Sequence, residues 1–203
     1  MIAIVDYGMG NLGSIHNMLR KVKADAVITS DRAVIEKADK LILPGVGAFD
    51  NAMRNLNQTG LVPVLNEKVL LQKTPILGIC LGMQVITRGS EEGSIPGLGW
   101  IDADTIRFTF QDKAMKVPHM GWNTVDVKRA DPLFEGMYEE PRFYFVHSYY
   151  VKCCREENVL TTTSYGPDFC SSLVKENIRG VQYHPEKSHK FGMKLLQNFA
   201  ELV

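Results

Sequence analysis

The sequence predicts an α/β protein with one domain, residues 1–203, in which helices flank a mixed, mostly parallel sheet. Three observations support this prediction. Apolar, β-branched runs alternate with amphipathic stretches in the first half of the chain, which is typical of parallel strands joined by helices. Strand-like runs broken by polar turns dominate the second half. No internal repeat and no linker rich in Pro, Gly or Ser divides the chain, whose length suits one hydrophobic core.

The parallel part of the predicted sheet lies before Cys80. We expect strands at residues 2–5, 26–28, 41–43 and 76–79, and helices at residues 12–22, 50–56 and 62–71. The run at 76–79 follows Pro75 and is wholly apolar, which indicates a strand buried on both faces. We therefore place this strand at the centre of the sheet.

The second half of the chain predicts antiparallel strands added to that sheet. Strand-like runs occupy residues 100–127, 143–151 and 159–165, and residues 170–174 and 178–183 form an expected hairpin with its turn at 175–177. Ser188 is a candidate cap for a closing helix. The apolar residues of that helix recur at helical spacing and are expected in the core, namely Phe191, Leu195, Phe199 and Leu202.

Charge and composition exclude several classes of function. Lys plus Arg and Asp plus Glu both number 23, so no net field would attract the chain to nucleic acid or to an anionic membrane. The opening MIAIVDYGMG has only a short apolar run and no basic leader, so we expect neither a signal peptide nor a membrane span, and a cytoplasmic protein. The four cysteines lack metal-ligand spacing, and we expect no metal and no cofactor.

One cysteine has the surroundings of a nucleophile. Cys80 lies between Gly78 and Gly82, directly after the central strand and before a helical run at 83–87. This is the nucleophile-elbow pattern, in which close approach of neighbouring chain requires small residues two positions before and after the nucleophile. The helix N-terminus favours the thiolate, and the backbone NH of Leu81 would face an oxyanion. By itself the pattern also suits a small buried cysteine in a tight turn.

A base with its own carboxylate partner occurs near the end of the chain. His184 and Glu186 flank Pro185, and residues two apart in extended chain point to one side, so Glu186 can orient the imidazole. A carboxylate on one ring nitrogen leaves the other to take the thiol proton. His147 fits a structural histidine better, and His119 could face a ligand or a partner. Cys80, His184 and Glu186 are therefore the predicted catalytic triad.

A glycine-rich loop could complete this site. Residues 44–47, with the sequence PGVG, follow the strand at 41–43, and their glycines permit positive φ and close approach of backbone to a ligand. A backbone NH of Val46 or Gly47 could supply the second oxyanion donor.

A second pattern supports a different class of protein. Residues 8–13, GMGNLG, match the G-x-G-x-x-G fingerprint after a first strand and before a helix, with Asp31 at the end of the second strand. This is the context of dinucleotide binding, so an oxidoreductase is the main alternative. An oxidoreductase of this kind would give no role to Cys80, His184 and Glu186. A non-enzymatic binding module, the third class, predicts a Cys80 no more reactive than the other thiols.

The motifs together resemble a known family. GICLGMQ around Cys80, HPE at 184–186 and PGVG at 44–47 resemble the class I, triad-type glutamine amidotransferases. The match narrows to the glutaminase subunits of imidazole glycerol phosphate synthases through further motifs along the whole chain: IVDYGMGNL at 4–12, LPGVGAF at 43–49, PHMGWN at 118–123, HSYY at 147–150 and GVQYHPEKS at 180–188.

This resemblance implies a flavodoxin-like amidotransferase fold and a step of histidine biosynthesis. Glutamine would be hydrolysed here, and the ammonia would pass to a separate cyclase subunit with a (β/α)₈ barrel, which makes imidazole glycerol phosphate and aminoimidazole carboxamide ribonucleotide. The resemblance implies that Gln84, Ser148 and Tyr149 bind glutamine. A glutaminase for another synthase, such as pyridoxal phosphate synthase, and a stand-alone γ-glutamyl hydrolase remain alternatives within the superfamily.

The resemblance also implies a heterodimer interface. The glycine loop at 8–13 would belong to the face that meets the cyclase, which accounts for the fingerprint without a nucleotide. We assign Asn11, Met120, Trp122 and Lys187 to this interface, with Lys187 expected in an ion pair that senses the partner.

Overall fold

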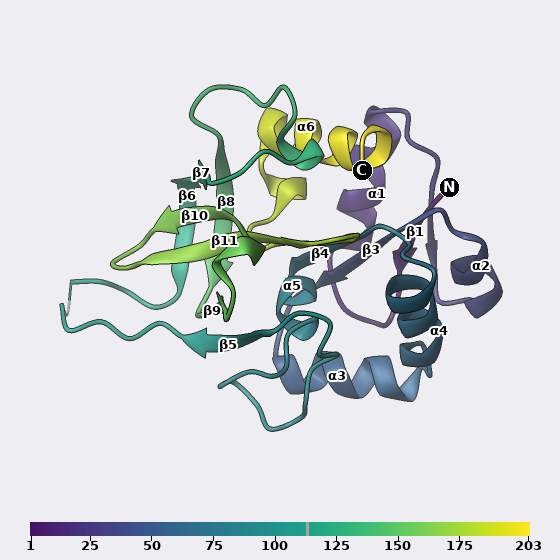
Figure 1. The fold of residues 1–203 in the computed structure, drawn as a ribbon, viewed down its shortest axis with the longest axis horizontal. Coiled ribbons are helices and arrows are strands. Elements are labelled where there is room, and N and C mark those ends of the chain that lie inside the picture. Colours follow the sequence, from purple (N-terminus) through teal and green to yellow (C-terminus); the bar gives the residue numbers. More distant parts are fainter. Residues whose placement is uncertain (113) are drawn as a thin grey trace.

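A computed structural model, which describes residues 1–112 and 114–203, has an α/β architecture with helices on both faces of a central sheet (Figure 1). The parallel part of the sheet has the strand order β2-β1-β3-β4-β12. Its strands are β1 (Ile2–Val5), β2 (Ala26–Thr29), β3 (Lys40–Gly45), β4 (Ile76–Cys80) and β12 (Ile178–Val181). Every residue of β4 is buried between β3 and β12, which confirms the predicted central strand.

Antiparallel strands extend the sheet beyond β12, as predicted. β12 pairs with β11, which pairs with β10 and also, at one residue, with β9. The outer pairs are β10 with β7 and β9 with β5. These strands are β5 (Ala103–Arg107), β7 (Asp126–Val127), β9 (Tyr149–Cys153), β10 (Val159–Ser164) and β11 (Asp168–Lys175).

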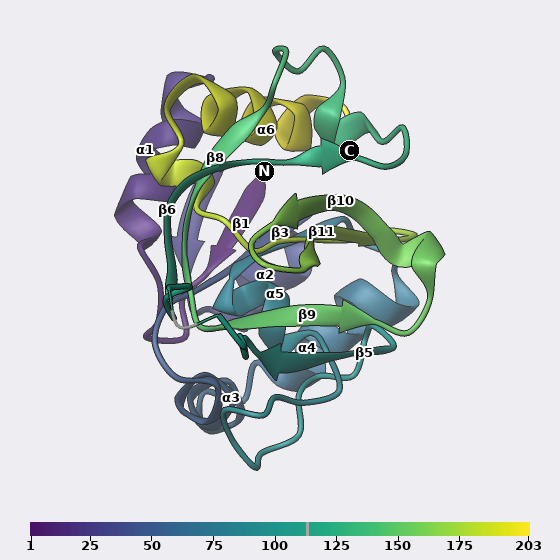
Figure 2. The same cartoon turned by 90° about the vertical axis from the view of Figure 1, so that its left-hand side faces the viewer.

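One strand pair lies outside the main sheet, which the sequence did not predict. β6 (His119–Thr124) and β8 (Arg142–His147) form a separate antiparallel sheet, standing apart from β9 and β5 in Figure 2. The run expected at 143–151 is therefore two strands, β8 and β9, which separate at Ser148 and pair with different partners. Because apolar and aromatic residues lie on both sides of Ser148, the sequence pattern does not show where β8 ends, and only the strand pairing does.

Two hydrophobic cores hold the helices against the sheet. Alternate residues of β1 divide between them, with Ala3 and Val5 on one face and Ile2 and Ile4 on the other, as the period of two requires. One core packs α2 (Arg32–Lys37), α3 (Phe49–Gln58), α4 (Val62–Asn66) and α5 (Leu81–Val85). The other packs α1 (Leu12–Lys21) and α6 (His189–Glu201), which lie together above the sheet in Figure 1.

Several local expectations need correction. The helix expected over 62–71 changes after Asn66 into a π-helical turn, η1 (Glu67–Leu71). Ser188 does precede α6, but its hydroxyl makes no cap; it donates to His184 O at 2.6 Å and accepts from Tyr144 N at 3.0 Å. Leu202 follows the end of α6 and is 48% exposed, so it is not a core residue.

Candidate active site

The predicted site residues meet at the C-terminal ends of neighbouring strands, where open α/β sheets place their sites. Residue pairing aligns Gly45 of β3 with Cys80 of β4, and Val181 at the end of β12 with Ile79. A cavity of about 650 Å³ opens there. It is lined by Gly10, Asn11, Val46, Gly47, Cys80, Leu81, Gln84, Glu92, Pro118, Val146, His147, Ser148, Tyr149, His184 and Lys187.

The elbow at Cys80 has the geometry that its glycines predict. Cys80 has a φ of 54° and a ψ of −109°, a strained conformation for a residue with a side chain, and α5 begins at the next residue. A Cβ on Gly82 would stand 1.8 Å from Leu43 O, and one on Gly78 would stand 2.7 Å from Gly82 O. Only glycine fits either position. The absence of side chains there lets the backbones of β3, β4 and α5 approach one another next to Cys80.

The predicted oxyanion loop lies beside the cysteine. Val46 and Gly47 line the cavity together with Cys80 and Leu81. Gly47 has a φ of +102°, which L side chains rarely adopt. The N-terminal glycine loop packs on the same segment, because a Cβ on Gly10 would stand 3.0 Å from the Cβ of Pro44. The two loops therefore lie in close contact.

The predicted pairing of His184 with Glu186 is present. Nδ1 of His184 lies 2.8 Å from Oε1 of Glu186, and both side chains are almost completely buried. The local structure differs from the expected extended chain, because Glu186 lies in a 3-10 turn, η4 (Pro185–Lys187), and His184 is its N-cap. His184 Nε2 is buried without a hydrogen-bond partner among the described residues. With Nδ1 on the carboxylate, Nε2 is the nitrogen that can exchange a proton with the thiol.

Electrostatics favour a charged imidazole at this position. Burial works against the imidazolium of His184, but interactions with Cys80 and Glu186 outweigh it and raise the pKa of His184 to about 10. Within the described part of the chain, no hydrogen bond of ordinary geometry joins Nε2 to the Cys80 sulfur, so we attribute the Cys80 contribution to attraction between opposite charges. The imidazolium form of His184, which can donate a proton, is therefore favoured at neutral pH.

The predicted glutamine-binding residues line the same cavity as the oxyanion loop. Gln84, Ser148 and Tyr149 all border it. Gln84 is buried, and its Nε2 donates to Tyr149 O at 3.1 Å. This hydrogen bond connects α5 to the start of β9.

Two further residues belong to the site and were not predicted there. Gln182 is fully buried, and its Nε2 lies 3.7 Å from the Cys80 sulfur. Glu92 lines the cavity and accepts from Phe49 N at 2.9 Å, which fixes the start of α3. Gln182 lies in the GVQYHPEKS motif and directly follows β12, and its position two residues before His184 was the available signal.

The two histidines outside the predicted triad form a buried pair. His119 and His147 face each other across β6 and β8, with Nδ1 of His119 3.0 Å from Nε2 of His147. His119 stacks between Phe145 and Tyr165 and is 3% exposed, so it does not face solvent or a partner. Burial lowers the pKa of His119 to about 4 and that of His147 to about 3. Both rings are therefore neutral at pH 7.

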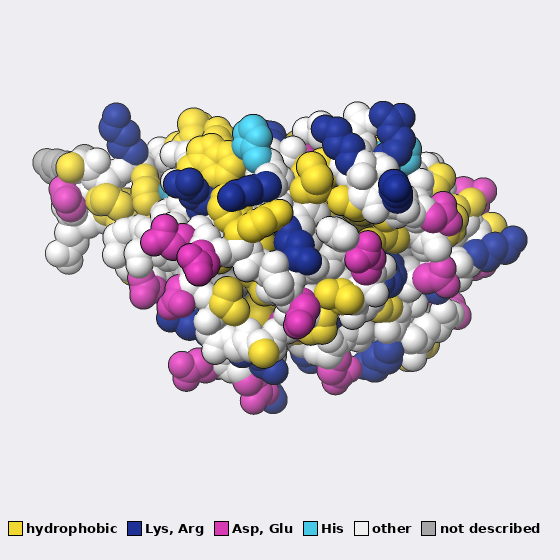
Figure 3. Space-filling model, turned by 90° about the horizontal axis from the view of Figure 1, so that it is seen from above, with side chains coloured by type: hydrophobic (Ala, Val, Ile, Leu, Met, Phe, Trp, Pro, Cys, Tyr) yellow, Lys and Arg dark blue, Asp and Glu magenta, His cyan; other side chains and the backbone are white. Residues whose placement is uncertain are grey.

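The residues assigned to a partner interface lie at the cavity or on the exposed strand near it. Asn11 and Lys187 line the cavity, and the Lys187 ammonium lies 5.8 Å from the centre of the Tyr144 ring. Met120 and Trp122 on β6 are 61% and 46% exposed, which is unusual for large apolar side chains. In Figure 3, on the face that carries α1 and α6, apolar side chains lie among basic and acidic ones.

The features of the dinucleotide fingerprint have other roles. Gly8 and Gly10 have positive φ and belong to the loop that packs on Pro44. The Asp31 carboxylate accepts from Ala33 N at 2.8 Å and caps α2. These contacts account for the fingerprint residues without a nucleotide.

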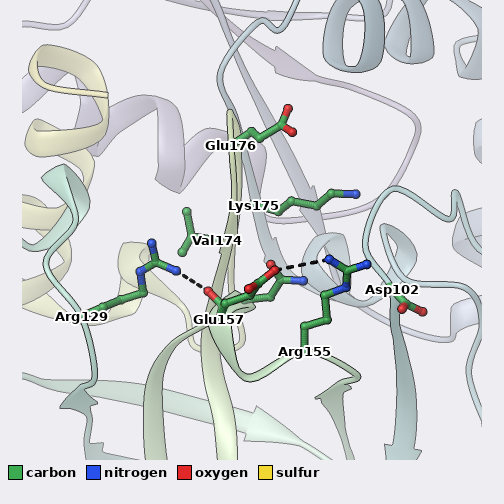
Figure 4. Close-up of a pocket in the computed structure, with 8 residues that line it drawn as sticks. Asp102, Arg129, Arg155, Glu157, Val174, Lys175 and Glu176 are labelled. Atoms are coloured by element: carbon green, nitrogen blue, oxygen red, sulfur yellow. Dashed lines mark hydrogen bonds and ion pairs between the residues drawn. The ribbon is translucent and has the colours of Figure 1, made fainter.

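A second cavity, of about 440 Å³, lies at the other end of the sheet (Figure 4). It is lined in part by Lys175 and Glu176 at the β11–β12 turn, and pairing places Ile178 beside Ile76, the first residue of β4. Its charged side chains have partners: Arg155 pairs with the Glu157 carboxylate at 3.4 Å, Arg129 donates to the backbone oxygen of Glu157, and Lys175 donates to Trp100 O at 3.0 Å. Among the described residues no cysteine or histidine lines it, so it lacks the chemistry of the first cavity.

Two kinds of feature are absent from residues 1–112 and 114–203. No helix in these ranges is long and apolar enough to cross a membrane. Within the same ranges, no group of three or more His, Cys, Asp or Glu side chains is arranged to hold a metal ion.

Comparison with known proteins identifies the family. Residues 3–202 match the family model described as glutamine amidotransferase class-I. A relative from Methanococcus maripaludis, imidazole glycerol phosphate synthase subunit HisH 2, is 57% identical over 199 residues, which cover 98% of each chain. A relative of the same name from Pseudomonas aeruginosa is 51% identical over 203 residues, covering all of both chains.

Solved structures support the fold. PurLQS from Thermotoga maritima has a TM-score of 0.72 at 17% identity, and the match covers 98% of this chain and 96% of its own. A glutamine amidotransferase from the same organism has a TM-score of 0.64 at 17% identity, with 91% and 75% covered. The sequence relatives, the family model and the observed mixed sheet agree: this chain belongs to the class I glutamine amidotransferases and, within them, to the HisH subunits of imidazole glycerol phosphate synthase.

Proposed function

We propose that residues 1–203 form one glutaminase domain, which hydrolyses glutamine to glutamate and ammonia with Cys80, His184 and Glu186. The observation that carries the proposal is the position of Cys80. It sits on a strained elbow in a cavity shared with a histidine whose other nitrogen is held by a buried carboxylate. Strain of this kind is maintained where function requires it.

The catalytic cycle follows from these positions. The Cys80 thiolate attacks the carboxamide carbon, and the NH groups of Leu81 and of Val46 or Gly47 stabilise the oxyanion. The tetrahedral intermediate collapses to a thioester as His184 donates its proton to the departing ammonia. His184, now neutral, takes a proton from water, which attacks the thioester and releases glutamate. Glu186 keeps the imidazole oriented and stabilises its charged form throughout.

Glutamine recognition is the role proposed for three further residues of the cavity. Gln84, Ser148 and Tyr149 would contact the bound amino acid, with Ser148, Tyr149 and Gly47 at its amino-acid end. Ser148 and Tyr149 lie where β8 and β9 separate and line the same cavity as Cys80, which supports this role.

The ammonia would be consumed by a second protein. The HisH relatives are named as subunits of a synthase, which supports a heterodimer with a cyclase subunit of (β/α)₈ fold that makes imidazole glycerol phosphate and aminoimidazole carboxamide ribonucleotide. The proposed docking surface comprises Asn11, Met120, Trp122 and Lys187. Exposed Met and Trp side chains beside the active cavity are typical of such surfaces. Histidine biosynthesis in the cytoplasm is the proposed setting.

Labelling with a glutamine analogue tests the triad. A diazoketone analogue of glutamine alkylates an activated thiol in a glutamine site, so peptide mapping should find the label on Cys80. Cys154 is exposed and serves as an internal control for general thiol reactivity. Label on Cys153, Cys154 or Cys170 with Cys80 untouched would contradict the proposal.

A reconstituted assay tests the division of labour between the two subunits. With the cyclase present, Cys80→Ala should abolish synthesis from glutamine and leave synthesis from added ammonia intact, because the acceptor chemistry belongs to the other chain. Equal loss of both reactions would refute this division.

A further inference from the structure

Gln182 is a fully buried polar residue whose amide reaches the reacting sulfur, and the proposed catalytic cycle gives it no role. It follows β12 and comes two residues before His184. Its Nε2 lies 3.7 Å from the Cys80 sulfur, and its Oε1 accepts from Gln84 Nε2 at 3.1 Å. The side chain therefore spans the distance between the nucleophile and a glutamine-site residue.

The direction of this amide is determined by the acceptor at the other end. The carbonyl oxygen of Tyr149 can only accept, so Gln84 must present its NH₂ group to it, at 3.1 Å. The second hydrogen of that NH₂ group then points at Gln182, which must present its oxygen. The NH₂ group of Gln182 is left to face the sulfur. If the Gln182 amide were rotated by 180°, its NH₂ group would face the NH₂ group of Gln84, and neither of these buried donors would have an acceptor there.

A second chain of hydrogen bonds also ends on the Tyr149 carbonyl. Nδ1 of His147 lies 2.8 Å from Tyr149 O and must donate to it, so the Nε2 of the neutral ring accepts from Nδ1 of His119 at 3.0 Å. Nε2 of His119 in turn faces the NH₂ group of Asn123 at 3.3 Å. Every donor and acceptor in this chain has one consistent assignment.

We propose that Gln182 is a further catalytic residue, whose amide NH donates a hydrogen bond to the Cys80 thiolate and whose orientation is imposed by Gln84 and the Tyr149 carbonyl. This role rests on the proposed glutaminase function. A neutral amide stabilises the thiolate more than the thiol, because a hydrogen bond to a charged acceptor is the stronger one. It does so without a second positive charge that would compete with His184 for the attacking sulfur.

Alkylation of Cys80 measures this role directly. Iodoacetamide reacts with the thiolate, so the rate of modification of the Cys80 peptide as a function of pH gives the midpoint of thiolate formation. Gln182→Met removes the donor at similar volume. We expect its midpoint to rise by about one pH unit, which means about tenfold slower alkylation at pH values below the midpoint. Gln58→Met, on the exposed end of α3, is the matched control and should keep the wild-type profile.

Kinetics with glutamine separate this role from a structural one. Gln182→Met should lower kcat at least about tenfold, because the amide donates to the attacking sulfur. The same variant removes the acceptor of Gln84 Nε2, so a rise in KM would report the altered Gln84 contact, and the fall in kcat would report the lost donor to the sulfur. If Gln182→Met does not unfold cooperatively, Gln182→Leu serves as the second variant, since it also removes the amide donor and places no charge beside the Cys80 sulfur. An unchanged alkylation midpoint and an unchanged kcat in a folded variant would overturn the proposal.

The same data separate this proposal from the proposed function. If wild-type protein with its partner released no ammonia from glutamine, the glutaminase function would fail, whatever the alkylation profiles showed. If wild type were active and the Gln182 variants matched it, only the role of Gln182 would fail.

Discussion

Gly82→Ala should damage both the fold and the reactivity of Cys80, because the elbow leaves no room for one added methyl group. The new Cβ would stand 1.8 Å from Leu43 O, and contacts below 3.0 Å are essentially never found for real Cβ atoms. The atom it meets is backbone of β3 and cannot rotate away. β3 and α5 would therefore have to separate by roughly 1 Å or more.

The expected magnitude combines two effects of opposite sign. Overpacking against rigid backbone costs about 3 kcal/mol. Replacing a helical glycine with alanine recovers up to about 1 kcal/mol. The net loss is about 2 kcal/mol or more, which corresponds to a fall in Tm of about 4–8 °C for a chain of this size.

Gly13→Ala is the matched control. Gly13 is the second residue of α1, as Gly82 is the second residue of α5, but an added Cβ at Gly13 would meet nothing within 4 Å. We expect Gly13→Ala to raise Tm by up to about 3 °C. Thermal denaturation of both variants, together with alkylation of the Cys80 peptide, measures the two consequences.

The displaced elbow should also slow catalysis. A shift of about 1 Å at a nucleophile costs on the order of 10²-fold in rate, so folded Gly82→Ala should turn over glutamine about 10²-fold more slowly. A Gly82→Ala protein as stable as Gly13→Ala, with wild-type alkylation of Cys80, would refute the steric argument.

The remaining predictions concern titration and coupling. Glu186→Gln should lower kcat less than His184→Ala in a glutaminase assay, because it keeps a hydrogen-bonding group and loses only the charge; an equal loss would contradict this. The pKa of His184 is raised to about 10 in the folded protein, so its stabilisation is complete below about pH 6.5 and is lost as pH rises through 10. Urea unfolding should therefore show a decline of up to about 1.4 kcal/mol per pH unit over this range that His184→Gln lacks. The pKa of His147 is lowered to about 3 in the folded protein, so below about pH 6.5 the unfolded chain binds a proton at this residue and the folded chain does not. The free energy of unfolding should therefore fall between pH 6.5 and pH 4, and it should fall less steeply in His147→Gln. The chain alone should release glutamate far more slowly than it does with the cyclase and the nucleotide ligand of the cyclase, and Lys187→Ala should weaken that activation. Full activity of the lone chain would show that the partner does not activate glutamine hydrolysis. Activation of Lys187→Ala to the wild-type rate would show that Lys187 does not sense the partner.

The elbow could be predicted from the sequence because its requirements are local. A strand that turns sharply into a helix needs glycines two positions either side of the nucleophile, and Gly78 and Gly82 supply them. The pairing of His184 with Glu186 was predicted for the same reason, since two residues so close in the chain can meet in several backbone conformations. The expected extended backbone was wrong and the contact was right.

The parallel half of the sheet was also predictable, because short apolar runs alternate along the chain with amphipathic helical stretches. Residues of β1 and β3 divide between the two cores with a period of two. The exposed Leu202, by contrast, continued the helical spacing of α6 beyond the point at which the helix ends.

Only the tertiary structure decided what lies beside Cys80 from distant parts of the chain. His119 and His147 become neighbours because β6 pairs with β8 in one particular register, and a shift by one residue would send them to opposite faces. Gln182 reaches the sulfur because β12 lies next to β4, although 102 residues separate the two in the chain. The sequence by itself predicted the proposed nucleophile Cys80, the proposed base His184 and the carboxylate of Glu186 that pairs with it, since the signals for each lie within a few residues. The amide beside the sulfur and the buried histidine pair depend on strand order and register, which arise from packing over the whole domain.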